Sequence, residues 1–251
     1  MKRNAIARLI VYSLLALVLT GVLVTGLRGE FHLFQTSLGG IVEGSAEYDP
    51  AQVQKIEISW ASGHVILTKD DVEQITIRQS RTGDKNENMR CALSNGTLKI
   101  DYNKRGLHIG TLPEKDLHIL VPWNWDCKEL EIDGAGLIIE LRDVNIDELS
   151  INGAGCQMYL SGGVHEVGID GAGCDITLNC TDRPKSIEVD GAGCVLSLTL
   201  PESCGFQLEM DGMGCELETD LLFTKGDGVY ISGNGHCKIE VNGLGCEVSI
   251  N

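Results

Sequence analysis

Five cysteines have a spacing that could support metal or redox chemistry. Each directly follows the second glycine of a short Gly-rich motif that recurs along the C-terminal half of the chain: Cys156, Cys174, Cys194, Cys215 and Cys246. If the repeats stack in register, the thiols form a column. Such a column could bind a soft metal ion, or be bridged by disulfides between neighbouring repeats.

The residues around these cysteines favour packing over chemistry. Cys174 alternates with Ile176 and Leu178, the spacing of side chains that share one face of a strand. In the first repeat the equivalent position is Leu137, which can replace a small hydrophobe but not a ligand or a redox partner. Free cysteine packs readily as a hydrophobe, so we expect a buried apolar column and no metal or cofactor. A bridge between Cys180 and Cys204, outside the column, stays open.

The Gly-rich motifs themselves mostly begin with an acid, and stacked carboxylates could attract calcium. However, Asn152, Ser232 and Asn242 interrupt the series, and the spacing is not that of the nine-residue calcium-binding repeat. Turn chemistry already explains Asp or Asn before Gly. We therefore interpret the following residues as structural corners: Asp133, Gly134, Gly136, Asn152, Gly153, Gly155, Asp170, Gly171, Gly173, Asp190, Gly191, Gly193, Asp211, Gly212 and Gly214.

Catalytic signatures are missing from the sequence. It contains no Ser-His-Asp pattern, zinc motif or phosphate-binding loop, and its six histidines are scattered. Each Asp-Gly-x-Gly motif is followed by a strand pattern, whereas a dinucleotide site needs a helix there. We expect no enzyme, and a polysaccharide-acting β-helix remains the enzymatic alternative.

The elements that position these residues are short strands. The first residues of six successive motifs lie 19, 18, 20, 21 and 21 positions apart, and each motif separates two runs of alternating apolar residues. One repeat of two strands and two corners cannot bury its apolar side alone and must stack on its neighbours. The sequence therefore predicts an all-β fold, a single parallel β-solenoid of either handedness, with repeats of about 20 residues.

Three local features refine this prediction. A seventh motif, Asn242-Gly-Leu-Gly245, follows the sixth after only 10 residues, so we expect it at the opposite corner. Variable stretches such as Thr181–Pro184 should also collect there. The segment Val121–Trp125 resembles a cap over the open end of the solenoid, although Trp60, Trp123 and Trp125 could instead form a sugar-stacking platform.

The N-terminal region predicts a membrane anchor. Leu9 to Leu27 are 19 residues without a charge, enough for a helix to span the hydrocarbon core of a bilayer. Lys2, Arg3 and Arg8 precede the run, so the N-terminus should be cytoplasmic and the β domain extracellular. A cleaved signal peptide is the competing interpretation. The lipid bilayer is thus a predicted partner, through a single-pass helix.

The predicted organisation has four parts. These are a cytoplasmic stub and transmembrane anchor at 1–28, a juxtamembrane linker at 29–52, N-terminal β coils and cap at 53–128, and the Gly-rich solenoid at 129–251. Four of the 20 basic residues lie in or beside the anchor, which leaves 16 against 36 acidic residues, a net charge of −20. Such an acidic surface argues against nucleic acid and anionic lipid as partners.

Several motifs together resemble a known family. Lys55-Ile-Glu-Ile58 before Ser62-Gly63, then Leu117–Pro122, then repeated strands around Gly corners are similar to the bacterial putative-adhesin domain family, over about residues 53 to 251. The resemblance implies a membrane-tethered β-solenoid at the cell surface and supplies no catalytic residues. We expect a non-enzymatic adhesin or binding scaffold for a protein or surface glycan. An envelope-stress or signalling accessory domain, which binds another membrane protein, is the alternative.

Overall fold

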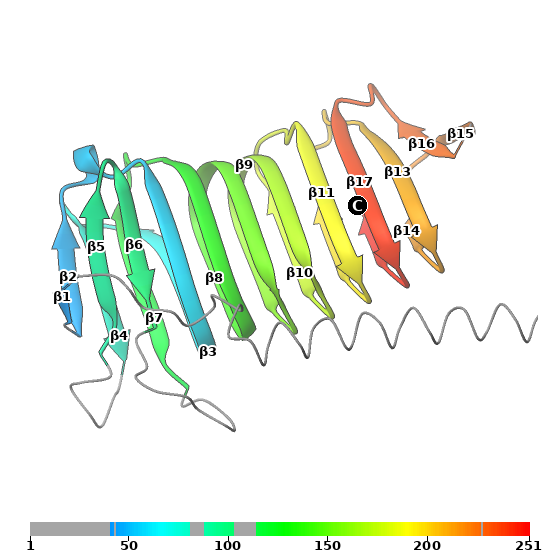
Figure 1. The fold of residues 1–251 in the computed structure, drawn as a ribbon. Coiled ribbons are helices and arrows are strands. Elements are labelled where there is room, and N and C mark those ends of the chain that lie inside the picture. Colours follow the sequence, from blue (N-terminus) through cyan, green and yellow to red (C-terminus); the bar gives the residue numbers. More distant parts are fainter. Residues whose placement is uncertain (1–40, 43, 81–87, 103–113, 227) are drawn as a thin grey trace, which may run out of the picture. The chain divides into compact units, whose positions relative to one another are not determined.

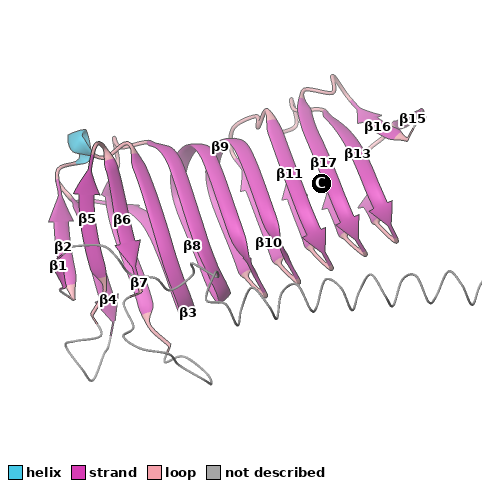
Figure 2. Cartoon of the chain, viewed as in Figure 1, coloured by secondary structure: helices cyan, strands magenta, loops and turns pink. Residues whose placement is uncertain are grey.

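The computed structural model describes residues 41–42, 44–80, 88–102, 114–226 and 228–251, and these are mostly β-strand (Figure 2). The predicted all-β class is confirmed for them. The one helical element among them is a single 3-10 turn, η2 (Pro50–Gln52), and the Asp49 side chain caps it by accepting a hydrogen bond from the Ala51 N–H.

The strands form two long ladders of hydrogen-bonded neighbours. Ladder B contains, in spatial order, β2 (Ser45–Tyr48), β4 (Ile75–Ser80), β7 (Asp116–Pro122), the second half of β3 (Lys55–Asp70), the middle of β8 (Cys127–Ala154), the first part of β9 (Gln157–Ala172), β10 (Asp175–Cys180), β12 (Val195–Thr199), β18 (Glu247–Ile250) and β14 (Glu216–Thr219).

Ladder A runs beside it and shares β3, β8 and β9, which bend from one ladder into the other. In spatial order it contains β1 (Ile41–Val42), β5 (Arg90–Ser94), β6 (Thr97–Asp101), the first half of β3, both ends of β8, the second part of β9, β11 (Ser186–Ala192), β17 (Cys237–Leu244), β13 (Phe206–Met213), β16 (Val229–Ser232) and β15 (Thr224–Gly226) (Figure 1).

Period-two alternation builds the core. In β10 and in each half of β3 every second residue is buried, because successive side chains of a strand point to opposite faces. Parallel pairing in register then places like residues side by side, as where Ile176 lies between Met158 and Leu196. The core is therefore a set of aliphatic rows that run across the strands.

The last two repeats do not stack in chain order. Strand β17 lies between β11 and β13, so the repeat nearest the C-terminus is inserted inside the one before it (Figure 1). Asn242 therefore pairs with both Asp190 and Asp211 in the common corner row, and the prediction that it occupies the opposite corner is wrong. The copy at the opposite corner is Ser232–Gly235, where the chain turns from β16 into β17.

Glycine makes this crossing feasible. After β16 pairs antiparallel with β13, the chain passes over the start of β13 at Gly205. A Cβ atom on Gly205 would lie 2.3 Å from the Ser232 carbonyl oxygen, so only glycine fits beneath the crossing. Gly233 and Gly235 turn with φ of 59° and 60°, and the Asn234 side chain accepts a hydrogen bond from the Gly205 N–H at 2.9 Å.

The N-terminal end differs from the predicted organisation in two respects. Strands β1 and β2 lie within the segment 29–52, so that segment is not only a linker. Trp125 does not cover the end of the ladders, because β1 and β2 are the outermost strands there. Its buried indole instead packs where the chain crosses the start of β3, and its N–H donates to the Val53 carbonyl at 3.3 Å.

The predicted anchor, Leu9 to Leu27, lies outside the described residues. Within the described ranges there is no helix with the length and apolar character needed to cross a membrane.

Candidate binding surfaces

The corner motifs lie in one straight row. Strand pairing places six of the seven first residues side by side, in the spatial order Asp133, Asn152, Asp170, Asp190, Asn242 and Asp211. Asn152 donates from Nδ2 to Asp133 Oδ1 at 2.8 Å, which joins the first two members. Ser232 lies outside the row.

The two glycines of each corner have different roles. The first allows close approach, since a Cβ on Gly191 would lie 1.8 Å from the Gly171 carbonyl oxygen. The second supplies the turn, since Gly136, Gly155, Gly173, Gly193 and Gly214 have φ between 63° and 77°. L-residues rarely adopt that region, so both glycines are required for structural reasons.

The cysteines that follow the corners also form a row, in the order Cys156, Cys174, Cys194, Cys246 and Cys215. The first four are buried and Cys215, in the outermost repeat, is partly exposed. Several thiols are within hydrogen-bonding distance of a corner carbonyl of a neighbouring repeat, as Cys156 is with Gly134 at 3.7 Å. Their surroundings are those of a packed core.

Ionisation of these thiols is governed by burial and by their neighbours. The hydrogen bond between Cys156 and Cys174 lowers the pKa of Cys156 and raises that of Cys174, and burial raises the latter further. Burial is also the main cause that raises the pKa of Cys194 and Cys246. Among the described residues, no group of three or more His, Cys, Asp or Glu side chains is arranged to hold a metal ion.

Three further cysteines gather at the opposite corner. Cys180 ends β10, Cys204 precedes β13 and Cys237 begins β17, and all three are buried. Burial, with a smaller contribution from the neighbouring thiols, raises the pKa of Cys180 and Cys237 to about 12. Protonated and enclosed thiols are weak nucleophiles at neutral pH, and all three cysteines are free.

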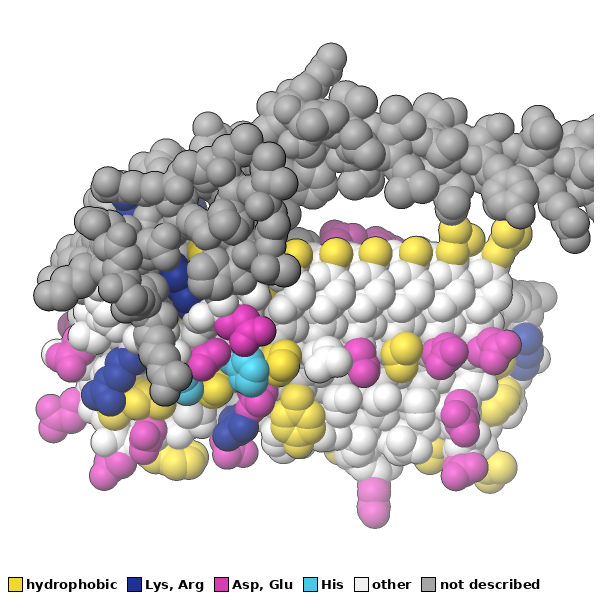
Figure 3. Space-filling model, turned by 90° about the horizontal axis from the view of Figure 1, so that it is seen from below, with side chains coloured by type: hydrophobic (Ala, Val, Ile, Leu, Met, Phe, Trp, Pro, Cys, Tyr) yellow, Lys and Arg dark blue, Asp and Glu magenta, His cyan; other side chains and the backbone are white. Residues whose placement is uncertain are grey.

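Outside the core, the corner carries an exposed apolar row. Ala135, Ala154, Ala172 and Ala192 continue into Leu244 and Met213, which are 53% and 68% exposed. Figure 3 shows this row as a line of yellow side chains. Its two large members both lie in the last two repeats.

The outer face of ladder A is acidic. Outward positions two residues before the corner carry Glu131, Glu188, Glu240 and Glu209, and strand pairing places the last three directly side by side. Like charges on neighbouring strands about 4.8 Å apart repel each other. The signal is visible in the sequence as Glu-x-Asp/Asn-Gly, but sequence reasoning used only its last two positions.

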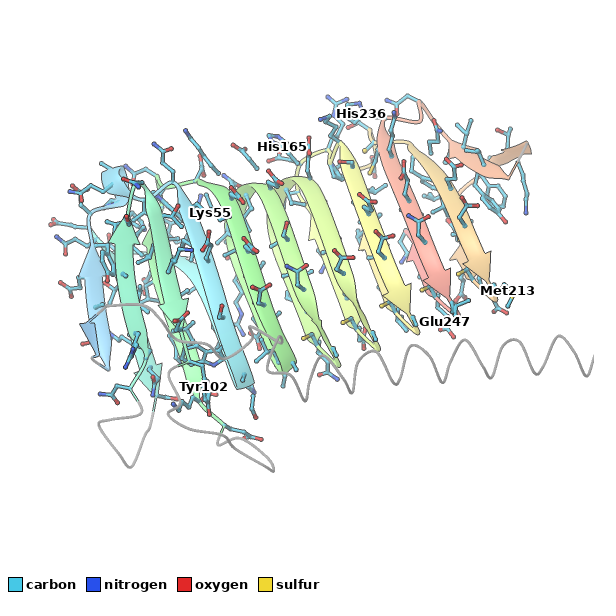
Figure 4. All side chains as sticks on the ribbon, viewed as in Figure 1. Lys55, Tyr102, His165, Met213, His236 and Glu247 are labelled. Atoms are coloured by element: carbon cyan, nitrogen blue, oxygen red, sulfur yellow. The ribbon has the colours of Figure 1, made fainter. Side chains whose placement is uncertain are left out.

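The two halves of the outer face of ladder A differ in whether lysines neutralise their acidic side chains. At the N-terminal end Lys55 Nζ lies 2.6 Å from Glu129, 2.9 Å from Glu131 and 3.1 Å from Glu57, and Lys99 also pairs with Glu57 (Figure 4 labels Lys55). Burial raises the pKa of Glu57, but the two lysines lower it more, so the net shift is downward.

No ion pair within the described ranges neutralises Glu188, Glu240 or Glu209. Lys185, at the edge of the same region, pairs with Glu166 instead. The C-terminal half of ladder A is therefore an acidic face whose three adjacent carboxylates have no ion pair, although the exposed Lys238 lies on the same face of β17, two residues before Glu240. We call Glu188, Glu240 and Glu209 the acidic row.

Ladder B carries a different surface. A shallow depression on β8, β9 and β10 is lined by Glu140, Arg142, Tyr159 and Asp175 among others. Tyr159 is 42% exposed, and its hydroxyl accepts a hydrogen bond from Asn179 at 3.1 Å. An exposed aromatic ring among polar groups can stack on a sugar.

Comparison with known proteins adds a broad similarity. No protein-family model matches the chain, and neither does any curated protein. Among solved structures, a putative cell adhesion protein from Clostridium sporogenes ATCC 15579 is 16% identical with a TM-score of 0.47. A putative adhesin from Bacteroides fragilis NCTC 9343 is 12% identical with a TM-score of 0.46. Each alignment covers 82% of this chain and 96% of the other. Likeness at this level decides neither fold nor function here.

Proposed function

We propose that this chain is a non-enzymatic, membrane-tethered scaffold of the adhesin type, and that the acidic face of ladder A binds a basic surface on a partner outside the cell. The observation that carries the proposal is the acidic row. Stacking three unpaired carboxylates costs stability, and a basic partner that neutralises them recovers this cost on binding.

The proposed scaffold is a parallel β-solenoid. Its support is the in-register parallel pairing through β9, β11 and β17 in one ladder and β9, β10 and β12 in the other. A stack of this kind holds rows of side chains at a fixed spacing over a long face, which suits binding to an extended surface.

The proposed tether is the apolar run Leu9 to Leu27, with the basic residues before it on the cytoplasmic side. Labelling intact cells with a membrane-impermeant amine reagent tests this topology. Lysines of the β domain, such as the exposed Lys238, should react from outside. Labelling that requires lysed cells would contradict an extracellular domain.

The binding proposal is tested with two variants of equal net charge. Glu188→Gln/Glu240→Gln removes charge from the acidic row, whereas Asp175→Asn/Glu202→Gln removes two exposed acids elsewhere. Full-length protein in neutral detergent is passed over immobilised polylysine at increasing salt concentration. We expect the first variant to elute at lower salt than the second. Equal elution would contradict a role for the row.

Cross-linking on intact cells then separates the biological alternatives. An adhesin should capture proteins or matrix from outside the cell, and a signalling accessory domain should capture another membrane protein. In either case the Glu188→Gln/Glu240→Gln variant should lose the captured partner and the control variant should keep it.

A glycan is the second candidate partner, and Tyr159 is the observation that favours it. Glycan-array binding that is lost in Tyr159→Ala and retained in Glu188→Gln/Glu240→Gln would show that the binding surface is on ladder B and not on ladder A.

A further inference from the structure

The outermost C-terminal repeat leaves one side of its core uncovered. Met210 in β13, Cys215 in the corner that follows and Leu217 in β14 are partly exposed. Their neighbours at the same positions in the next repeat, Val241, Cys246 and Val248, are at most 2% exposed. The inward row of side chains therefore ends at an open surface.

The main chain is open at the same place. Among the described residues β14 pairs with β18 alone, and β16 covers only Phe206–Glu209 of β13. Glu216 donates its N–H to the Cys246 carbonyl at 2.9 Å. Successive residues of a parallel strand bond to opposite sides, so the N–H and C=O of Leu217 point away from β18.

Acidic side chains border this edge on both faces. Asp211 lies on the ladder A side, and Glu216 and Glu218 on the ladder B side, all of them exposed. None of the three takes part in an ion pair within the described part of the chain. Figure 4 labels Met213 and Glu247 at this end of the ladders. The edge therefore combines apolar inward positions with negative outward ones.

These charges disfavour a second copy of the chain as the occupant. Two β14 strands paired antiparallel about Leu217 would place Glu216 of each copy beside Glu218 of the other, and like charges directly opposite are destabilising. The N-terminal edge strand β2 of another copy carries the exposed Glu47, so it offers no complementary charge either.

We propose that the edge of β14 is a strand-addition site for an extended partner segment in which apolar residues alternate with lysine or arginine. The apolar side chains would continue the inward row beyond Leu217, the basic side chains would pair with Glu216 and Glu218, and the main chain would bond to Leu217. This site uses Glu216 and Glu218 on the ladder B side, whereas Glu188 and Glu240 of the acidic row lie on ladder A, so either proposal can fail alone.

The probe is a six-residue peptide of alternating lysine and valine with blocked ends, labelled with a fluorophore. Fluorescence anisotropy measures its binding to the full chain in a neutral detergent, with detergent alone as the blank. We expect the lysine–valine peptide to bind about tenfold more tightly than the glutamate–valine peptide of the same length. Added salt should reduce this difference in affinity. N-methylation of alternate peptide bonds should abolish binding, because strand addition needs the peptide main chain.

Two variants test the position of the site. Leu217→Pro removes an edge N–H without touching the bonds to β18, and should weaken peptide binding about tenfold. Because proline can also disturb folding, Glu218→Lys provides a milder change that should weaken the lysine–valine peptide and strengthen the glutamate–valine peptide.

Asp175→Lys is the matched control. Asp175 shares a row with Glu216 but lies three strands further in, beyond the screening length of physiological salt, so binding should not change.

Three outcomes would overturn the proposal. These are equal binding of the two peptides, equal effects of Glu218→Lys and Asp175→Lys, and self-association of the chain that Leu217→Pro abolishes. Loss of peptide binding in Glu188→Gln/Glu240→Gln would instead assign the peptide to the acidic row.

Discussion

The chain crosses over a neighbouring strand at both ends of the ladders, and different residues pack the two crossings. At both ends the stacking order departs from the chain order. The chain crosses a neighbouring strand between β7 and β8 at one end, which leaves β3 inside β7, and between β16 and β17 at the other, which leaves β17 inside β13. The first crossing is packed by the indole of Trp125, and the second depends on Gly205.

The two ends also differ in how far antiparallel strands cover the parallel stack. The N-terminal repeat is closed by antiparallel strands in both ladders, β5 and β1 on one side and β4 and β2 on the other, and its core residues Ile75 and Ile77 are fully buried. The C-terminal repeat has an antiparallel neighbour in ladder A only.

The difference indicates separate roles. An open sheet edge invites pairing, and proteins protect it by covering it or by charging it. At the N-terminal end antiparallel strands cover the parallel stack, and the edge strand β2 is short. Charge at the C-terminal end repels copies of the same acidic chain and still admits a basic strand. The comparison predicts that stability is concentrated at the covered end and binding at the open one.

The largest expected effect comes from truncating matched core residues at the two ends. Ile77→Ala in β4 should destabilise the domain by about 2–5 kcal/mol, because the covered end cannot collapse around the cavity. Leu217→Ala in β14 should cost less than about 1 kcal/mol, since the side chain is partly exposed already. Thermal melts of the full chain by near-ultraviolet circular dichroism measure both, and equal shifts in Tm would refute the stability difference.

Corner glycines give the second effect. Gly191→Ala should cost about 2–3 kcal/mol, because its Cβ would meet the Gly171 carbonyl oxygen inside the stack. Gly193→Ala is the matched control, with no atom within 4 Å of its Cβ but a φ of 64°, and should cost about 1 kcal/mol.

Gly212→Ala extends this test to the open end. Its Cβ meets the Gly243 carbonyl oxygen at the same 1.8 Å, but strand β13 is free to move outward there. Its cost should fall below that of Gly191→Ala. If both variants melt alike, the terminal repeat is held as firmly as the interior.

The third effect concerns the N-terminal half of ladder A, where lysines neutralise the acidic side chains. Lys55→Gln should cost about 1 kcal/mol at pH 7, because it leaves Glu129 and Glu131 unpaired and Glu57 paired with Lys99 alone. Burial lowers the pKa of Lys55, but its three carboxylate hydrogen bonds raise it more, so the net shift is upward.

The raised pKa of Lys55 and the lowered pKa of Glu57 set the pH window. The stability from Lys55 is present below its unfolded pKa of about 10.4 and is lost as pH rises through the higher folded value. That from Glu57 is present above about 4.3 and is lost as pH falls through the lower folded value. The Tm difference between wild type and Lys55→Gln should therefore be largest between about pH 5 and 10. A difference that does not vary with pH would show that Lys55 acts through packing alone.

Much of this arrangement could be predicted from sequence because its causes are local. Alternation identifies strands such as Thr97–Asp101, and the repeated Asp-Gly-x-Gly motif identifies the corners. Leu137 in a cysteine position correctly indicates that the column faces inward.

The order of the last repeats could not be predicted, because it depends on a long-range crossing. Ser232–Gly235 and Asn242–Gly245 have nearly the same four-residue pattern. The residue that follows separates them, since Cys246 matches the column whereas His236 does not, but it does not give the order of the repeats. The crossing requires that the segment Ser232–Gly235 fits over Gly205. This fit depends on both segments and cannot be inferred from either one alone. Since the open edge of β14 is a consequence of that crossing, the candidate strand-addition site was also beyond sequence reasoning.

The smallest expected effect compares acids of the corner row near the two ends. Burial raises the pKa of Asp133, and the charges of Glu131 and Glu57 add to this against the hydrogen bond from Asn152. A carboxyl group with a raised folded pKa disfavours folding once it ionises, so Asp133→Asn should raise stability slightly at pH 7, by less than about 0.5 kcal/mol. The gain should be lost as pH falls through the raised folded pKa of Asp133 toward the unfolded value of about 3.9. Asp211→Asn, at the exposed end of the same row, should leave Tm unchanged. A gain of equal size at Asp211 would mean that general charge repulsion, and not burial within the stack, governs the corner row.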